Sequence, residues 1–283
     1  MKKTLVVLIV IFFAAFCGLS TVVAAPKPRV ILSPKKAGPG DLLLITVKNA
    51  EGSVEGKFAG RRIYFNPAGK AMKAVVGVDL NSEPGIYPLE LSINGTKHTN
   101  EVRILKKKYP LQRLTLPKDK VTLSPEDEAR TDREQKKLAM IWPVESLRLW
   151  NGNFQDPLPG KEITTLFGVR RIINNIPKSS HTGVDLAAEE GDPVHAPNDG
   201  VVVVAEDLFY SGNSLVLDHG QGIYTMFFHL SKMNVRYGQA VRKGDVTGLV
   251  GATGRVTGAC LHWGTRVQGA RVDPLELIRL KLE

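Results

Sequence analysis

The chain has little cysteine and few long apolar runs. Only two cysteines occur among 283 residues, which excludes a small scaffold held together by several disulfides. Charged residues make up 23% and aromatic residues 7%, and no internal repeat or low-complexity tract stands out, so collagen-like, coiled-coil and multi-span membrane proteins are excluded. The hydrophobic fraction of 43% is enough for one large domain or two modest ones.

Positive charge exceeds negative charge. The 38 Lys and Arg residues and 28 Asp and Glu residues leave a formal net charge of +10. Such a balance predicts an anionic partner, which could be nucleic acid, a membrane surface or an acidic polymer such as a cell wall. The 27 glycines and 17 prolines indicate turns and short strands.

Residues 1–24 have the pattern of a secretory signal peptide. Lys2 and Lys3 precede the apolar run Leu5–Phe16, and small residues ending at Ala24 suit cleavage there. The alternative is an uncleaved anchor, which would be the chain's one membrane attachment. Export predicts a periplasmic or cell-wall location and argues against nucleic acid as the partner. Removing the two lysines changes the charge from +10 to +8 and leaves Cys260 as the only cysteine.

Residues 28–105 predict a small all-β domain. Short apolar runs are separated by Gly, Pro and Asn, and Tyr87, Leu89, Leu91 and Ile93 occupy every second position of one segment. Asn94-Gly95 then suits the two positive-φ positions of a type I′ hairpin turn. About six or seven strands in this length predict an immunoglobulin-like β-sandwich.

Residues 106–145 predict a basic linker followed by a helix. Lys106–Lys108 begins the linker. Ser124-Pro125 and the acidic residues that follow form a helix start, with serine as the N-cap and proline in the first turn. We expect this helix to reach about Ile141 and to be mostly solvated, because it offers few apolar side chains.

Residues 150–283 predict a second all-β domain, a compact antiparallel sheet or barrel. Val201–Ala205 is an apolar run expected to be buried on both faces, and His219–Gly222 predicts a hairpin turn. Helical patterning returns only at Pro274–Leu280. The fold class predicted for the whole chain is therefore all-β, with a sandwich, a helical linker and this C-terminal domain.

Five of the six histidines follow residue 180. On a strand, His181 and Asp185 would share a face but lie roughly 13 Å apart, so one metal ion could bind both only if the chain bends, most easily at Gly183. Cys260 and His262 would share a strand face at about 6 to 7 Å. Taken alone, a His near an Asp is more often a surface pair or a helix N-cap than a metal site, and a Cys-x-His on a strand more often serves packing than chemistry. His195 and His219 lie in turn-rich contexts and are expected to be structural.

Several short motifs follow one another in the second domain. In order they are Ser180-His181-Thr182-Gly183-Val184-Asp185-Leu186, Gly200-Val201-Val202, Asp218-His219-Gly220, Phe228-His229-Leu230-Ser231, Thr253-Gly254, Leu261-His262-Trp263 and Arg271-Val272-Asp273-Pro274. The series spans about Phe154 to Leu277 and resembles the lysostaphin-type (LytM-type) zinc metallopeptidases, which cut peptide bonds in peptidoglycan. The sandwich and acidic helix are also similar to the N-terminal region of exported members.

The resemblance implies a zinc site and a reaction. His181 and Asp185 match the family's HxxxD ligands, and His262 matches the second histidine of its HxH motif. These three would hold one zinc ion per chain and leave the fourth position for water. His229 matches a catalytic histidine that helps activate water or stabilise the oxyanion. The implied function is that of an exported zinc-dependent endopeptidase that hydrolyses peptidoglycan peptides, with zinc-activated water as the nucleophile.

Cys260 departs from the family's pattern. The family usually has Gly-Pro-His-Leu-His where this chain has Gly258-Ala259-Cys260-Leu261-His262. Cys260 therefore replaces a usual catalytic histidine and is a second catalytic candidate beside His229. Loss of a general base costs about 10²- to 10⁴-fold in rate, whereas a thiolate ligand would close the water position. The alternative function is a weakly active or inactive member that binds the wall or regulates another hydrolase.

We also expect the sandwich to be dispensable for the chemistry. It contains no candidate catalytic cluster, and a basic linker separates it from the histidines. A fragment that begins at about residue 142 is predicted to fold and bind zinc.

Overall fold

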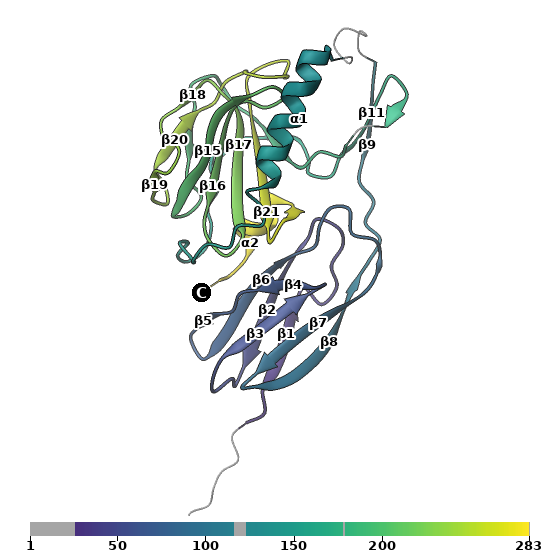
Figure 1. Cartoon of the computed structure of the whole chain (residues 1–283), viewed down its shortest axis with the longest axis vertical. Coiled ribbons are helices and arrows are strands. Elements are labelled where there is room, and N and C mark those ends of the chain that lie inside the picture. Colours follow the sequence, from purple (N-terminus) through teal and green to yellow (C-terminus); the bar gives the residue numbers. More distant parts are fainter. Residues whose placement is uncertain (1–25, 116–122, 178, 283) are drawn as a thin grey trace, which may run out of the picture.

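The computed structural model describes residues 26–115, 123–177 and 179–282. The predicted signal peptide of residues 1–24 lies outside these residues. The described chain is mostly β, as the sequence predicts, and forms two β bodies joined by a segment that carries helix α1 (Pro125–Ala139) (Figure 1). Neither helix of the described residues has the length and hydropathy needed to cross a bilayer.

The N-terminal body is a sandwich of two four-stranded sheets. One sheet has the order β1-β2-β6-β5, and the other has the order β4-β3-β7-β8. The strands are β1 (Arg29–Ser33), β2 (Leu42–Lys48), β3 (Val54–Phe58), β4 (Arg61–Ile63), β5 (Asn66–Ala68), β6 (Ala71–Gly77), β7 (Gly85–Ile93) and β8 (Thr96–Ile104). Alternate residues such as Leu43, Ile45, Leu89 and Leu91 form its core. Its immunoglobulin-like character stays a prediction.

Two local predictions in the first half of the chain are confirmed. Asn94 and Gly95 have φ values of 52° and 78°, so both central residues of the β7–β8 turn are left-handed. Ser124 caps α1, because its side-chain oxygen accepts a hydrogen bond from the Asp127 amide at 3.1 Å. The helix ends at Ala139, close to the predicted Ile141.

The C-terminal body is built on one large antiparallel sheet with the order β10-β13-β21-β17-β16-β15-β19, and β22 pairs with β21. The strands are β10 (Ile163–Thr165), β13 (Gly183–Ala187), β15 (Gly200–Leu208), β16 (Gly212–Asp218), β17 (Ile223–Leu230), β19 (Ala240–Val241), β21 (Cys260–Val267) and β22 (Ala270–Val272). Its core includes Val184, Leu215, Phe227 and Trp263, all fully buried. The predicted hairpin turn lies between β16 and β17, and helix α2 (Pro274–Arg279) follows β22.

Two small sheets flank the large one. The first contains β14 (Pro193–His195), β20 (Val246–Leu249) and β18 (Lys232–Met233). The second contains β12 (Ile176–Pro177), β11 (Arg170–Ile173) and the linker strand β9 (Leu111–Leu114), which pairs with β11 in parallel. The linker therefore contributes a strand to the C-terminal body.

Strand β15 differs from the prediction of burial on both faces. Val202 and Val204 are buried, whereas Val201, Val203 and Ala205 are only half-buried. The half-buried residues of this run are also apolar, because α1 lies along this part of the sheet and partly covers the face on which they lie (Figure 1).

The two bodies share a hydrophobic cluster. Leu42 and Val75 of the sandwich pack with Val267 and Val272 of the C-terminal body. Beside them, Arg271 on β22 donates to Asp79 in a fork, with Nε at 3.0 Å from Oδ2 and Nη2 at 2.7 Å from Oδ1. These contacts argue against the expectation that the second body folds alone.

Candidate active site

Adjacent strands bring the three predicted metal ligands together. Asp185 on β13 and His262 on β21 are direct cross-strand partners. His181 precedes β13, so the strand spacing of roughly 13 Å does not apply to it. At Gly183, where β13 begins, an added Cβ would lie 2.4 Å from the Trp263 carbonyl oxygen and 2.7 Å from His262 Nε2. Only glycine allows this approach.

The ligand atoms converge on one point. Asp185 Oδ1 lies 2.9 Å from His181 Nε2 and 2.8 Å from His262 Nδ1. The two ring nitrogens are 3.0 Å apart. Both histidines are buried and the aspartate is half-buried.

This donor set fits a metal cation. His181 Nδ1 donates its proton to the Leu166 carbonyl at 3.0 Å, which leaves a lone pair on Nε2. That lone pair faces a carboxylate oxygen at hydrogen-bond distance, and two acceptors repel there unless a cation lies between them. Ligand atoms of a tetrahedral zinc lie about 3.3 Å from one another. The observed triangle is slightly smaller and has the same shape.

The charge states also suit metal binding. Burial works against the charge of Asp185, but the adjacent imidazoles of His181 and His262 hold the pKa of its carboxyl well below the usual range. Burial lowers the pKa of His262 and keeps the ring neutral. An ionised carboxylate and neutral imidazoles are the forms that bind metal.

Two further side chains hold this cluster. The Phe228 ring stacks on His262 with the ring centroids 5.2 Å apart and the planes tilted by 2°. Arg171 on β11 places Nη2 at 3.7 Å from Asp185 Oδ2, on the oxygen that faces away from the histidines. Phe228 thus restricts the orientation of the His262 ring, and Arg171 restricts that of the Asp185 carboxylate.

His229 lies beside the three ligands, near the end of β17. Its φ of 66° is unusual for a residue other than glycine, and it turns the ring away from the regular strand direction. The Thr253 carbonyl accepts the Nδ1 proton at 2.9 Å, so Nε2 is left as an acceptor. Its ring centroid is 6.3 Å from that of His262. Burial lowers the pKa of His229, which favours the neutral ring.

Cys260 lies at the first position of β21, two residues before His262 and on the same strand face. Its sulfur is not part of the converging donor set formed by the described residues. Burial, followed by the nearby Asp185 charge, raises the pKa of the thiol to about 11. The structure thus gives Cys260 no role as a fourth ligand.

His219 is structural, as predicted. Its Nδ1 donates to the Asp199 carbonyl at 2.7 Å, and its Nε2 accepts from the Thr225 hydroxyl at 2.8 Å. Burial lowers the pKa of this ring to about 4. Both nitrogens are occupied, so the ring ties together the turn between β16 and β17.

The sequence reasoning missed the groups that orient the histidines. The carbonyls of Leu166 and Thr253 carry no sequence signal, because every residue type offers the same oxygen. Phe228 and Arg171 become recognisable only when the pairing of β17 with β21 and of β13 with its neighbours is known.

Comparison with known proteins agrees with this geometry. Residues 179–274 match the model of peptidase family M23. The chain is 44% identical over 96 residues to the peptidoglycan DD-endopeptidase ShyA of Vibrio cholerae, a match covering 34% of this chain and 22% of that protein. It is 38% identical over 122 residues to the DD-carboxypeptidase/endopeptidase Mpg of Neisseria meningitidis, covering 43% and 28%. The matched part is thus under a third of either relative.

One solved structure resembles nearly the whole chain. A crystal structure of an M23 peptidase from Pseudomonas aeruginosa has 30% sequence identity and a TM-score of 0.67, over 86% of this chain and 95% of that one. The fold is that of an M23 peptidase, and the converging donor set is of a kind that could hold a metal ion. The chain belongs to peptidase family M23.

Proposed function

We propose that this protein is a zinc-dependent endopeptidase that hydrolyses peptide bonds in peptidoglycan. The observation that carries the proposal is the convergence of His181, Asp185 and His262 within hydrogen-bond distance of one another. One zinc ion per chain would be held by these three residues. When bound, zinc lowers the pKa of a water molecule and polarises the scissile carbonyl.

The protein's own groups would supply the remaining steps. His229 Nε2 can take a proton from the attacking water, since Nδ1 is held by Thr253, and the ring protonated in this way can then donate to the developing oxyanion. Leu166 and Phe228 hold the ligand rings in place. The alternative is a weakly active member that binds the wall or regulates another hydrolase, because Cys260 replaces a histidine of the family pattern.

The names of the relatives favour a particular bond. ShyA and Mpg are both named for DD activity, on peptide bonds between two D-centres. We infer that this chain acts on the same class of bond, between D-alanine and the D-centre of the next residue. Action on peptidoglycan and the predicted signal peptide support a place outside the cytoplasmic membrane.

The proposal is tested by metal analysis and by digestion of purified cross-linked peptidoglycan. We expect about one zinc per chain, release of cross-linked peptides as monomers, and loss of both metal and activity in His181→Ala. His229→Ala should keep the metal and lose most of the activity. His195→Ala is the matched control, because His195 contacts Gly244 and lies outside the cluster. A chain that binds zinc but releases no fragments would favour the regulatory alternative.

A further inference from the structure

Arg255 lies on the loop that holds the candidate catalytic histidine. Thr253, two residues earlier, accepts the His229 Nδ1 proton at 2.9 Å. The Arg255 amide donates to the Tyr210 carbonyl at 2.9 Å, and the His229 amide donates to Ser211 at 2.8 Å. These bonds connect the loop after β20, the loop after β15 and His229 into one unit.

Arg255 is an exposed residue, and its guanidinium lies near two aromatic rings. It lies 5.5 Å from the centroid of Tyr210 and 6.0 Å from that of Phe209. Tyr210 is 45% exposed. Among the described residues, no carboxylate lies within 4.0 Å of Arg255. The cation is therefore positioned without being neutralised.

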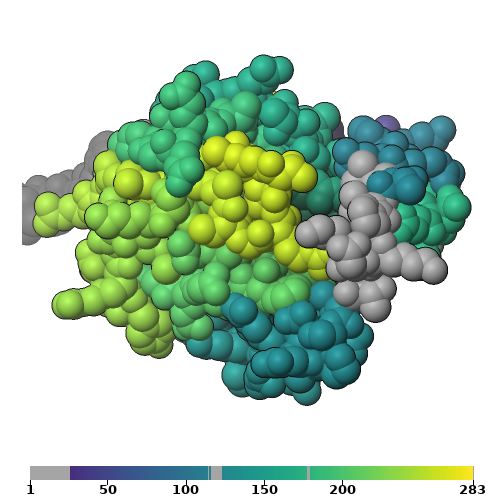
Figure 2. All heavy atoms as spheres, turned by 90° about the horizontal axis from the view of Figure 1, so that it is seen from above, coloured from purple at the N-terminus to yellow at the C-terminus, as the bar shows by residue number. Residues whose placement is uncertain are grey.

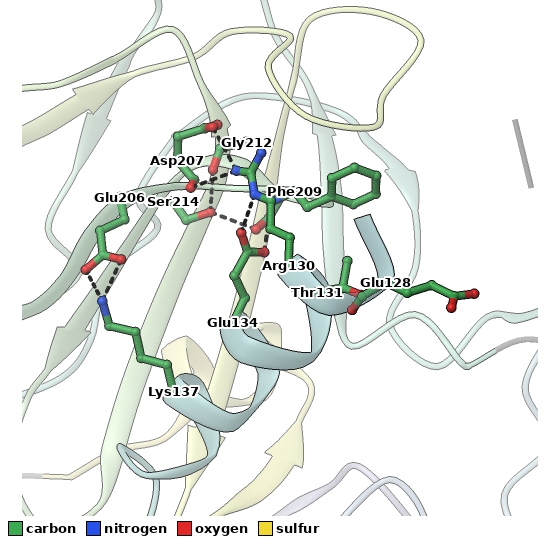
Figure 3. Close-up of polar contacts among 11 residues, drawn as sticks. Glu128, Arg130, Thr131, Glu134, Lys137, Glu206, Asp207, Phe209, Gly212 and Ser214 are labelled. Carbon is green, nitrogen blue, oxygen red and sulfur yellow. Dashed lines mark hydrogen bonds and ion pairs between the residues drawn. The ribbon is translucent and has the colours of Figure 1, made fainter. Parts of the chain in front are cut away.

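Arg130 on α1 differs from Arg255 because its charge is paired with carboxylates. Its guanidinium also lies near Phe209, at 5.8 Å from the ring centroid. However, it is paired with Glu134 at 2.7 Å and with Asp207 at 3.0 Å, as Figure 3 shows. Arg130 therefore fixes the loop to the helix, whereas the charge of Arg255 remains available to a ligand. Figure 2 looks down on this end of the molecule, where yellow and green segments gather beside the teal helix α1.

We propose that Arg255 binds a carboxylate of the substrate peptide next to the scissile bond. The proposal rests on the proposed function. A planar guanidinium binds a carboxylate through two parallel hydrogen bonds. In a DD bond, the residue on the amine side keeps its own carboxylate one carbon from the scissile nitrogen, whether the bond joins two stem peptides or ends one. Arg255 would recognise that group, and the exposed Tyr210 ring would contact the carbon chain beside it.

The test uses two synthetic peptides with the full chain. One contains a D-alanyl bond followed by a residue with a free carboxylate, and the other has the same carboxylate amidated. We expect the wild type to prefer the acid, and Arg255→Gln to lower kcat/KM on the acid by about 10- to 100-fold. The amide should be cleaved equally by both proteins. Arg255→Lys keeps the charge but not the planar fork, so its kcat/KM on the acid should lie between those of the wild type and Arg255→Gln.

Arg236→Gln is the matched control, because Arg236 is an exposed arginine in the turn before β19 that makes no ion pair with any residue the structure describes. It should leave both rates unchanged. An equal loss on the acid and the amide in Arg255→Gln would overturn the proposal, since it would make Arg255 a support for the loop.

A binding measurement distinguishes a failure of this proposal from a failure of the proposed function. If the wild type cleaves neither peptide, the proposed function fails, and calorimetric titration of the uncleaved peptides into the full chain still tests Arg255. Tighter binding of the acid that is lost in Arg255→Gln supports the carboxylate contact. Equal affinity of the wild type for acid and amide contradicts it.

Discussion

Cys260 stands where the family pattern has a catalytic histidine, but its thiol is a poorer base than an imidazole. It shares a strand face with His262 and yet lies outside the donor set of the described residues. Imidazole, with an ordinary pKa near 6.5, is a better base at neutral pH than a thiol with an ordinary pKa near 8.5. A histidine at this position should therefore improve catalysis without altering the ligands.

We predict that Cys260→His raises peptidoglycan cleavage by about 100-fold, the low end of a general-base effect. Zinc content should stay the same. The measurement is the initial rate of fragment release from purified wall, normalised to bound metal. Cys260→Ala is the companion variant and should also keep its zinc. Loss of zinc in that variant would make the thiol a ligand, which the geometry argues against.

The ligand set shows what can be predicted at the level of single residues. His181, Asp185 and His262 were identified through the resemblance, while the strand spacing alone left His181 and Asp185 too far apart. The structure resolves this because β13 begins at Gly183 and His181 lies outside it. A strand boundary depends on tertiary pairing, here with β21, and local sequence does not define it.

Among the elements, α1 connects the linker to the active-site loops. Glu134 accepts from Arg130 Nε at 2.7 Å with one oxygen and from the Phe209 amide at 2.9 Å with the other. In the loop Phe209–Ser211, the Ser211 carbonyl also accepts a hydrogen bond from the His229 amide. A single carboxylate of the helix thus contacts the loop that positions His229 (Figure 3).

We predict that Glu134→Gln loosens the loop Phe209–Ser211. A hydrogen bond to a charged group contributes about 1.5–3 kcal/mol, so amide exchange at Phe209 should become at least about 10-fold faster. The rate of cleavage should fall with no loss of zinc. Glu128→Gln is the control on the same helix, since the Glu128 side chain points away from the loop in Figure 3. Equal exchange in the two variants would show that α1 does not hold the loop.

The elements themselves were mostly predictable. The start of α1 at Pro125, the Asn94-Gly95 turn and the short helix at Pro274 follow from capping and turn chemistry, which acts within a few residues. The pairing of linker strand β9 with β11 was not predicted. It joins residues about sixty positions apart, roughly Leu111 to Arg170, and the sequence between them gives no signal for the register.

On the scale of the whole molecule, the sandwich is attached through a shared core. Leu42 and Val75 are buried against residues of β21 and β22, and Asp79 pairs with Arg271 at the same junction. Hydrogen bonds to Arg271 outweigh burial and lower the pKa of Asp79 to about 2. This pair therefore stabilises the folded chain above an ordinary carboxyl pKa near 4, and that stability is lost as the pH falls toward 2.

The neighbouring residues Leu42 and Leu43 allow the coupling between the two bodies to be measured. Both are fully buried in β2, but Leu42 faces the shared cluster and Leu43 faces the core of the sandwich. Each change to alanine should lower the free energy of unfolding by about 2–5 kcal/mol. We predict that only Leu42→Ala also speeds amide exchange in β22 and α2, because it removes the side chain that covers them. If both variants affect the sandwich alone, the C-terminal body is independently stable, and the fragment from about residue 142 should fold as the sequence predicts.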